Sequence, residues 1–173
     1  HDSNAKLIEK SMIKHSYIEK YEAPSLLVKP HGRNLINSFF EGDILEISST
    51  LKRIFVAKRT LMDINHLAKG VFSHLEGFLN EDNFELVLND MRLVNGIVWS
   101  IPIILQVDEE TIKKVRNEDQ IILSYIGNKE DYAVLSIEDI YEVNKSKMLV
   151  KWFGTDDPKH PGVSYIANQG NYA

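Results

Sequence analysis

The chain has 173 residues, of which 43% are hydrophobic and 26% charged, as expected for one globular domain with a core of its own. Its formal net charge of -5 disfavours a protein that works by binding nucleic-acid phosphates, and no apolar run approaches the roughly 20 residues that span a bilayer. The absence of cysteine excludes disulfides, thiolate zinc sites and a cysteine nucleophile, and it favours a reducing compartment, the cytoplasm.

Residues 1–25 are expected to form an N-terminal arm, and residues 26–173 a single domain. The arm is rich in Lys, Glu and Ser, and its apolar residues have only loosely helical spacing, so it is interpreted as a weak helix or a mobile arm. His1 in place of Met, with no signal-peptide pattern behind it, is interpreted as a tag or processing remnant. Pro30 to Gly32 begin the irregular lead-in to the domain.

Two strand and helix signals follow in the first half of the domain. Arg53 to Val56 predict a short strand, and the apolar stripe from Leu61 to Ala68 predicts a helix that stops at Gly70. Asn80 is a good helix N-cap, and acidic residues follow it in the first turn, where the helix dipole favours them. The helix after it places four apolar residues on one face: Phe84, Val87, Leu88 and Met91.

A β-hairpin is predicted around Asn95-Gly96, because a type I′ turn needs two residues that tolerate positive φ. The strand continues from Ile101 to Val107, and period-2 alternation would send Trp99, Ile101 and Ile103 to one buried face.

The rest of the chain predicts one capped helix and three strands. Asp108 is expected to cap a short helix, and the strands are residues 120–125, 132–141 and 147–153, with a turn at Gly127-Asn128. Because parallel βαβ signals are few, the fold class is α+β: a small mixed or antiparallel barrel-like sheet with flanking helices.

The sequence contains no motif that indicates catalytic, cofactor or metal residues. The six histidines lack zinc-ligand spacing, no glycine-rich phosphate loop is present, and no serine lies in a nucleophile elbow. Pairs of acidic residues occur where caps, turns or solvated faces explain them. The basic cluster Lys52-Arg53 with Lys58-Arg59 lacks interleaved aromatics and is interpreted as a solvated strand edge.

The segment from Phe153 to Val163 is dense in turn-forming residues. It is interpreted as the end of a strand, a turn, and the start of a helix, with Asp157 as the cap and Pro158 at the first helical position. Apolar Val163 and Tyr165, with Phe153, are expected to be partly exposed. The segment is predicted to be an interdomain hinge and contact surface made by Phe153, Gly154, Thr155, Asp156, Asp157, His160, Pro161 and Gly162.

Four blocks in order resemble the N-terminal, PUA-like domain of the ATP sulfurylase (sulfate adenylyltransferase) family. They are Pro30-His31-Gly32, residues 70–79 (similar to the family's Gly-x-Phe-Ser-Pro-Leu-x-Gly-Phe-Met), residues 96–105 (Gly-x-x-Trp-x-Ile-Pro-Ile), and residues 153–163 (Phe-Gly-Thr-Asp-x-x-His-Pro-Gly-Val). The likeness runs from about Leu27 to Tyr172. Two departures, Arg33 for a common Gly and His74 for the Pro, affect local loop geometry.

The resemblance implies a parent enzyme that makes adenosine 5′-phosphosulfate and pyrophosphate from ATP and sulfate with magnesium, in sulfate assimilation or the reverse direction. That reaction is carried by a Gln-x-Arg-Asn-Pro-x-His-x-x-His segment, which is absent from these 173 residues. The chain is therefore expected to be inactive alone, to bind no cofactor, and to partner the catalytic domain of a homo-oligomeric enzyme.

Two other classes stay open. A free-standing PUA-like RNA-binding module would use the same fold, because fold alone does not fix function. An independent small enzyme has no motif behind it.

Overall fold

The computed structural model describes residues 9–10, 36–38 and 50–173, so most of the expected N-terminal arm and the lead-in at Pro30 to Gly32 lie outside the described residues. The chain divides into two compact units. The first takes the described residues up to Gly77 together with Glu118–Ile137, and the second takes Phe78–Asn117 with Glu138–Ala173. Each unit is built from two separate stretches of chain.

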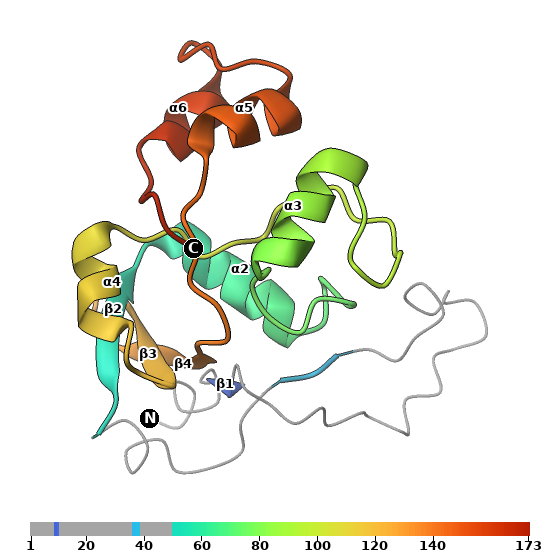
Figure 1. The fold of residues 1–173 in the computed structure, drawn as a ribbon. Coiled ribbons are helices and arrows are strands. Elements are labelled where there is room, and N and C mark those ends of the chain that lie inside the picture. Colours follow the sequence, from blue (N-terminus) through green and yellow to red (C-terminus); the bar gives the residue numbers. More distant parts are fainter. Residues whose placement is uncertain (1–8, 11–35, 39–49) are drawn as a thin grey trace. The chain divides into compact units, whose positions relative to one another are not determined.

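The first unit contains a mixed sheet of four strands in the order β1-β4-β3-β2 (Figure 1). The strands are β1 (Glu9–Lys10), β2 (Lys52–Val56), β3 (Gln120–Tyr125) and β4 (Asp131–Ser136). β3 and β4 are antiparallel, whereas the outer pairs β2/β3 and β1/β4 are parallel. The expected α+β class and mixed sheet are confirmed. Among the described strands the sheet does not close, so the expected barrel is not found there.

The centre of this sheet is β3, which is buried on both faces. Ile121 to Ser124 are all buried, and the side chain of Leu123 is 0% exposed. A strand covered on both sides has an unbroken apolar run instead of an alternating one. The predicted strand 132–141 is too long, because the ladder of β4 stops at Ser136 and the chain passes into the second unit at Glu138.

The helix predicted after β2 is confirmed as α2 (Lys58–Ala68). Its buried face consists of Ile64, Leu67 and Ala68. The chain then turns at Gly70, whose φ of 70° is one that glycine adopts without steric cost.

Two helices of the second unit begin at the caps that the sequence predicts. In α3 (Glu81–Asp90) the Asn80 side chain accepts from the Asn83 N–H at 3.1 Å. In α4 (Glu109–Val115) the Asp108 side chain accepts from the Thr111 N–H at 2.8 Å. Met91 ends α3 in a left-handed conformation and is exposed, so it does not extend the buried stripe as expected.

The strand predicted at residues 147–153 is wrong, because this stretch is the helix α5 (Lys145–Phe153). Its apolar residues, Met148 to Val150 and then Trp152 and Phe153, form a short stretch interrupted by Lys151, and such a stretch fits a strand or a helix equally well. The deciding signals flank the run: the Asn144 side chain accepts from the Lys147 N–H at 3.0 Å, and Gly154 ends the helix in the left-handed region. α5 packs against the next helix, α6 (Pro161–Ala167) (Figure 1).

The predicted hairpin exists, but with a different turn. Arg92 and Val98 form an antiparallel bridge, and the Gly96 N–H donates to the Leu93 carbonyl at 2.8 Å. Gly96 has a φ of 83°, whereas Asn95 is not among the residues with positive φ. A type I′ turn needs both, so the turn belongs to the longer class in which a single left-handed glycine closes the loop.

No regular strand forms over residues 101–106, although one was predicted there. Pro102 has no N–H to donate to a ladder, which breaks the strand where it would begin. The predicted buried face is only partly correct: Ile103 is 8% exposed, Ile101 is 45% exposed, and Trp99 is half-buried. The Ile103 carbonyl accepts instead from the Leu79 N–H at 2.9 Å.

Candidate functional site

The segment predicted to be an interdomain contact connects α5 to α6. It starts at Gly154, which has a φ of 71° and donates its N–H to the Val150 carbonyl at 3.0 Å. Glycine is the usual residue in this position because it has no Cβ to clash. The segment therefore leaves a helix, and the expectation that it leaves a strand is wrong.

The polar side chains of the turn are used locally. Thr155 Oγ1 accepts from the Asp157 N–H at 3.1 Å, and Asp157 Oδ1 accepts from the Lys159 N–H at 2.9 Å. His160 Nδ1 accepts from the Val163 N–H at 3.3 Å and is the N-cap of α6. Each is a short-range bond of the kind that Ser, Thr, Asp and His side chains make in turns and caps.

The cap is placed one proline later than predicted. α6 begins at Pro161 with His160 as its cap, whereas Pro158 lies in the preceding turn. Asp157 is a turn acceptor and does not cap a helix. The φ angle of proline is fixed at a helical value, so Pro158 and Pro161 suit the first helical position equally well. Only the geometry of the cap shows that the helix begins at Pro161.

Three rings and one glycine pack closely at the start of α6. The Phe153 ring lies 4.6 Å from the Trp152 ring and 5.0 Å from the His160 ring, measured between centroids. A Cβ on Gly162 would lie 2.8 Å from two atoms of the Phe153 ring. Phe153 and Tyr165 are half-buried, as expected, but Val163 is 1% exposed and belongs to the core instead of the surface.

The polar residues of this turn are exposed or are hydrogen-bonded within it. Asp156, Asp157, Lys159 and His160 are exposed, and the bonds named above already employ the turn's acceptors. Turn and cap formation accounts for Thr155, Asp157 and His160. The predicted role of the eight residues from Phe153 to Gly162 as an interdomain surface stays a prediction.

The tail that follows α6 was not predicted, and its backbone is hydrogen-bonded to other segments of the second unit. The Val107 N–H donates to the Tyr172 carbonyl at 2.8 Å, and the Tyr172 N–H donates back at 3.2 Å. Tyr141 and Ala173 exchange two further backbone bonds of 3.0 Å each. The tail therefore lies between two segments that are distant in sequence.

Two more residues fix the tail where it leaves α6. Lys145 Nζ donates to the carbonyls of Ala167 and Gln169, and Gln106 Nε2 donates to the Gly170 carbonyl at 3.1 Å. A Cβ on Gly170 would lie 1.8 Å from the Val107 carbonyl oxygen, so only glycine fits. An isolated Gly near the chain end was the only local signal of this close approach.

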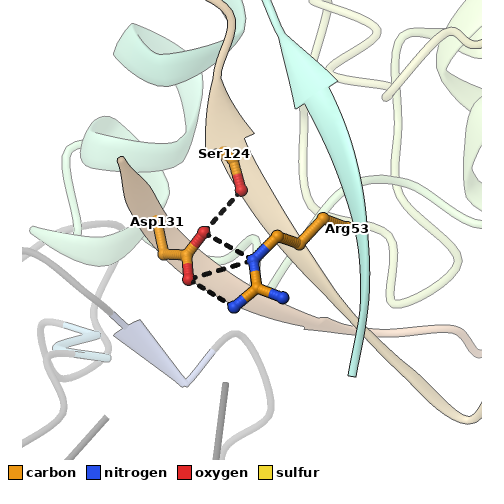
Figure 2. Close-up of polar contacts among 3 residues, drawn as sticks. All are labelled: Arg53, Ser124 and Asp131. Carbon is orange, nitrogen blue, oxygen red and sulfur yellow. Dashed lines mark hydrogen bonds and ion pairs between the residues drawn. The ribbon is translucent and has the colours of Figure 1, made fainter. Parts of the chain in front are cut away.

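Two residues of the basic cluster in the first unit, Lys52 and Arg53, form ion pairs. Figure 2 shows Arg53 on β2 facing Asp131 on β4, with Nε and Nη2 at 3.0 to 3.3 Å from the carboxylate. Buried Ser124, on the strand between them, donates to Asp131 Oδ1 at 2.7 Å. Lys52 pairs with Glu118 at 2.8 Å. Among the described strands, β2 is the outermost of this sheet, which supports the interpretation of Lys52 and Arg53 as a strand edge.

The loop at residues 70–77 has one unusual backbone conformation. His74 has a φ of 104°, which a proline ring cannot adopt. The preceding Ser73 is buried and donates to the Gly70 carbonyl, and its Oγ accepts from the Ile36 N–H at 3.4 Å. His74 therefore gives this loop a path that the Pro of the resembling block would not allow, as its departure suggested.

Acidic pairs in the second unit have structural partners. The Glu81 N–H donates to Asp139 Oδ2 at 3.0 Å, and the Tyr141 hydroxyl donates to the Leu79 carbonyl at 2.9 Å. Burial, assisted by Asp139 and two glutamates, raises the pKa of Tyr141 far above its ordinary value, so its hydroxyl stays protonated.

In the part of the chain that the structure describes, no group of three or more His, Asp or Glu side chains could hold a metal ion.

Among the described residues, no helix combines the length and the apolar character needed to cross a bilayer.

Comparisons with known proteins give one family. The sequence model of a PUA-like domain matches residues 28–173. The sulfate adenylyltransferase of Persephonella marina is 35% identical over 149 residues, which are 84% of this chain and 38% of that protein. The sulfate adenylyltransferase of Aeropyrum pernix is 39% identical over 152 residues, again 84% of this chain and 39% of that protein.

A solved structure is similar at the level of fold. "Hexameric APS kinase from Thiobacillus denitrificans" superposes with a TM-score of 0.51 at 21% identity, over 58% of this chain and 20% of that one. In the sequence comparisons, the chain spans about two fifths of the length of the curated relatives it matches.

Proposed function

The chain belongs to the PUA-like domain family, and from this premise we propose that it is the non-catalytic N-terminal domain of a sulfate adenylyltransferase. One observation carries the proposal: relatives of that name match more than four fifths of this chain at 35 to 39% identity, yet the match is only 38 to 39% of their length. The parent enzyme would convert ATP and sulfate to adenosine 5′-phosphosulfate and pyrophosphate, and the greater part of it would lie outside these residues.

The chemistry of the reaction belongs to that absent part. Nucleotidyl transfer depends on cations that stabilise the spread charge of the phosphates. In this proposal ATP and Mg²⁺ are bound by the catalytic domain, and this chain contributes no catalytic residue.

The role of the chain in the parent enzyme would be to support and orient that catalytic domain. The segment from Phe153 to Gly162 would lie against it, with the exposed turn between α5 and α6 as the contact. The parent would be a cytoplasmic homo-oligomer. The short-range hydrogen bonds of Thr155, Asp157 and His160 would hold the turn in one conformation without help from the catalytic domain.

The RNA-binding alternative has less support. Recognition of RNA needs cations or stacking aromatic side chains that are available to the ligand. Lys52 and Arg53 are paired with Glu118 and Asp131, and the whole chain has a net charge of -5.

Two parallel assays test the proposal. The 173-residue chain, with ATP, Mg²⁺ and sulfate, should release pyrophosphate no faster than a blank without protein. The protein from the complete parent reading frame should release it at a rate that scales with enzyme. Turnover by the repurified short chain would disprove its non-catalytic role, and an inactive parent would disprove the sulfate adenylyltransferase assignment.

A further inference from the structure

The hairpin of the second unit, residues 91–101, exposes apolar side chains that are not part of the buried core. Four of the nine large hydrophobic side chains that the described residues expose lie within eleven residues of sequence. They are Met91, Val94, Val98 and Ile101, each at least 45% exposed. Monomeric proteins scatter such side chains, and a concentration of them marks an interaction site.

The backbone pairing of the hairpin places part of this surface on one face. Arg92 and Val98 are directly opposite each other, because the Leu93 N–H donates to the Ile97 carbonyl at 2.9 Å and the Trp99 N–H to the Met91 carbonyl at 2.8 Å. Directly opposed residues project to the same side of a hairpin. Leu93, which alternates with Arg92, is 4% exposed, so the Arg92 and Val98 face points outward.

The hairpin is also nearly free of charge. Residues 92–107 contain Arg92 as their one charged residue, in a chain of which 26% is charged. Its guanidinium donates to the Gly96 carbonyl at 2.9 Å, within the hairpin itself. Charged residues are depleted at the centre of protein interfaces, and permanent interfaces are the most hydrophobic class, resembling a core cut in half.

We propose that the exposed apolar surface of residues 91–101 is a permanent docking surface for the rest of the parent polypeptide. The inference rests on the proposed function and adds a second contact to the turn between α5 and α6. The occupant follows from length: the curated relatives carry more than half of their chain beyond the region matched here, and that portion is a permanent partner by covalent connection.

Side-chain footprinting with hydroxyl radicals tests the proposal directly. Met91 and Val98 are exposed and chemically reactive, so they should be oxidised readily in the 173-residue chain. In the complete parent protein their oxidation should fall several-fold. Ile126, exposed on the first unit at 64%, serves as the internal reference and should be oxidised equally in both proteins.

A charge placed in the surface gives a second readout. Val94→Glu with Val98→Glu should leave the melting temperature of the short chain within about 2 °C of the original, as is usual for exposed sites. In the parent protein the same pair should loosen the two parts, seen as faster proteolytic separation and a split melting transition. Ile126→Glu is the matched control and should change neither.

The outcomes separate the two proposals. Equal oxidation of Met91 and Val98 in the short chain and in an active parent overturns the docking surface while the assigned function stands. Protection in a parent that lacks activity upholds the docking surface while the assigned function falls. If the short chain dimerises in sedimentation and the paired Glu variant is monomeric, with no added protection in the parent, the occupant is a second copy and the proposal is overturned.

Discussion

The turn between α5 and α6 and the tail after α6 belong to the same unit, and they are stabilised in different ways. The turn satisfies its backbone through Thr155, Asp157 and His160, each of which bonds to a residue two or three positions on. The tail bonds to Val107 and Tyr141, which are far away in sequence. The turn can therefore keep its shape when tertiary packing is weakened, whereas the tail can exist only in the folded unit.

Gly170→Ala is expected to have the largest effect. Its Cβ would lie 1.8 Å from the Val107 carbonyl oxygen, and a backbone atom cannot move aside as a flexible side chain can. The tail would separate from Val107. The free energy of unfolding, measured in urea, should fall by about 4 kcal/mol or more, a loss that single substitutions cause only when they disrupt the structure severely.

Gly77→Ala is the matched control. A Cβ on Gly77 has nothing within 4 Å, and no positive φ is recorded there, so stability should be unchanged or slightly higher. A Gly170→Ala protein as stable as this control would show that the tail is not seated on Val107.

Ile103→Ala tests the segment that leads into Val107. Ile103 is 8% exposed, and truncating it should cost about 3 kcal/mol, within the range for a buried Ile. Ile101→Ala removes the same atoms at a site that is 45% exposed and should cost less than about 0.5 kcal/mol. If the two substitutions lowered the unfolding free energy equally in chemical denaturation, Ile101 and Ile103 would both be buried on one face. That result would contradict the irregular backbone of residues 101–106.

Gly162→Val addresses the turn. The added Cβ would lie 2.8 Å from the Phe153 ring, but the ring's outer end can shift, so the expected cost is about 1 to 2 kcal/mol by thermal or urea unfolding. In the parent enzyme, activity should fall only in proportion to the enzyme that is lost. A fully assembled, equally stable variant that loses turnover by orders of magnitude would place the turn in an active site.

Asp108→Ala should have the smallest effect, roughly 0.5 to 1 kcal/mol for a lost N-cap next to Val107. Hydrogen bonds from the Thr111 side chain and backbone hold the pKa of Asp108 below its ordinary value. The stabilisation is therefore complete above the ordinary carboxyl pKa and is lost as pH falls through the lowered one. The gap between the original and Asp108→Ala should close in acid; a gap that is constant down to pH 2 would contradict the cap.

Local signals were sufficient for several elements and for the fold class. The caps at Asn80 and Asp108, the strand at residues 120–125 and the α+β class were all predicted from the sequence and are confirmed. The family was also identified from four short blocks, and the PUA-like match over residues 28–173 confirms it. Turn chemistry around Gly154 was recognised, although the element that it ends was not.

Tertiary structure decided what the local pattern left ambiguous. The mainly apolar stretch at residues 147–153 suits a strand or a helix, and in the folded chain it is the helix α5, packed against α6. The tail around Tyr172 has no periodicity of its own, because its partners Val107 and Tyr141 lie elsewhere in the chain. Composition, caps and motifs are properties of neighbouring residues, so the sequence by itself determined them. Pairing between distant segments depends on which surfaces meet, and only the folded chain determines that.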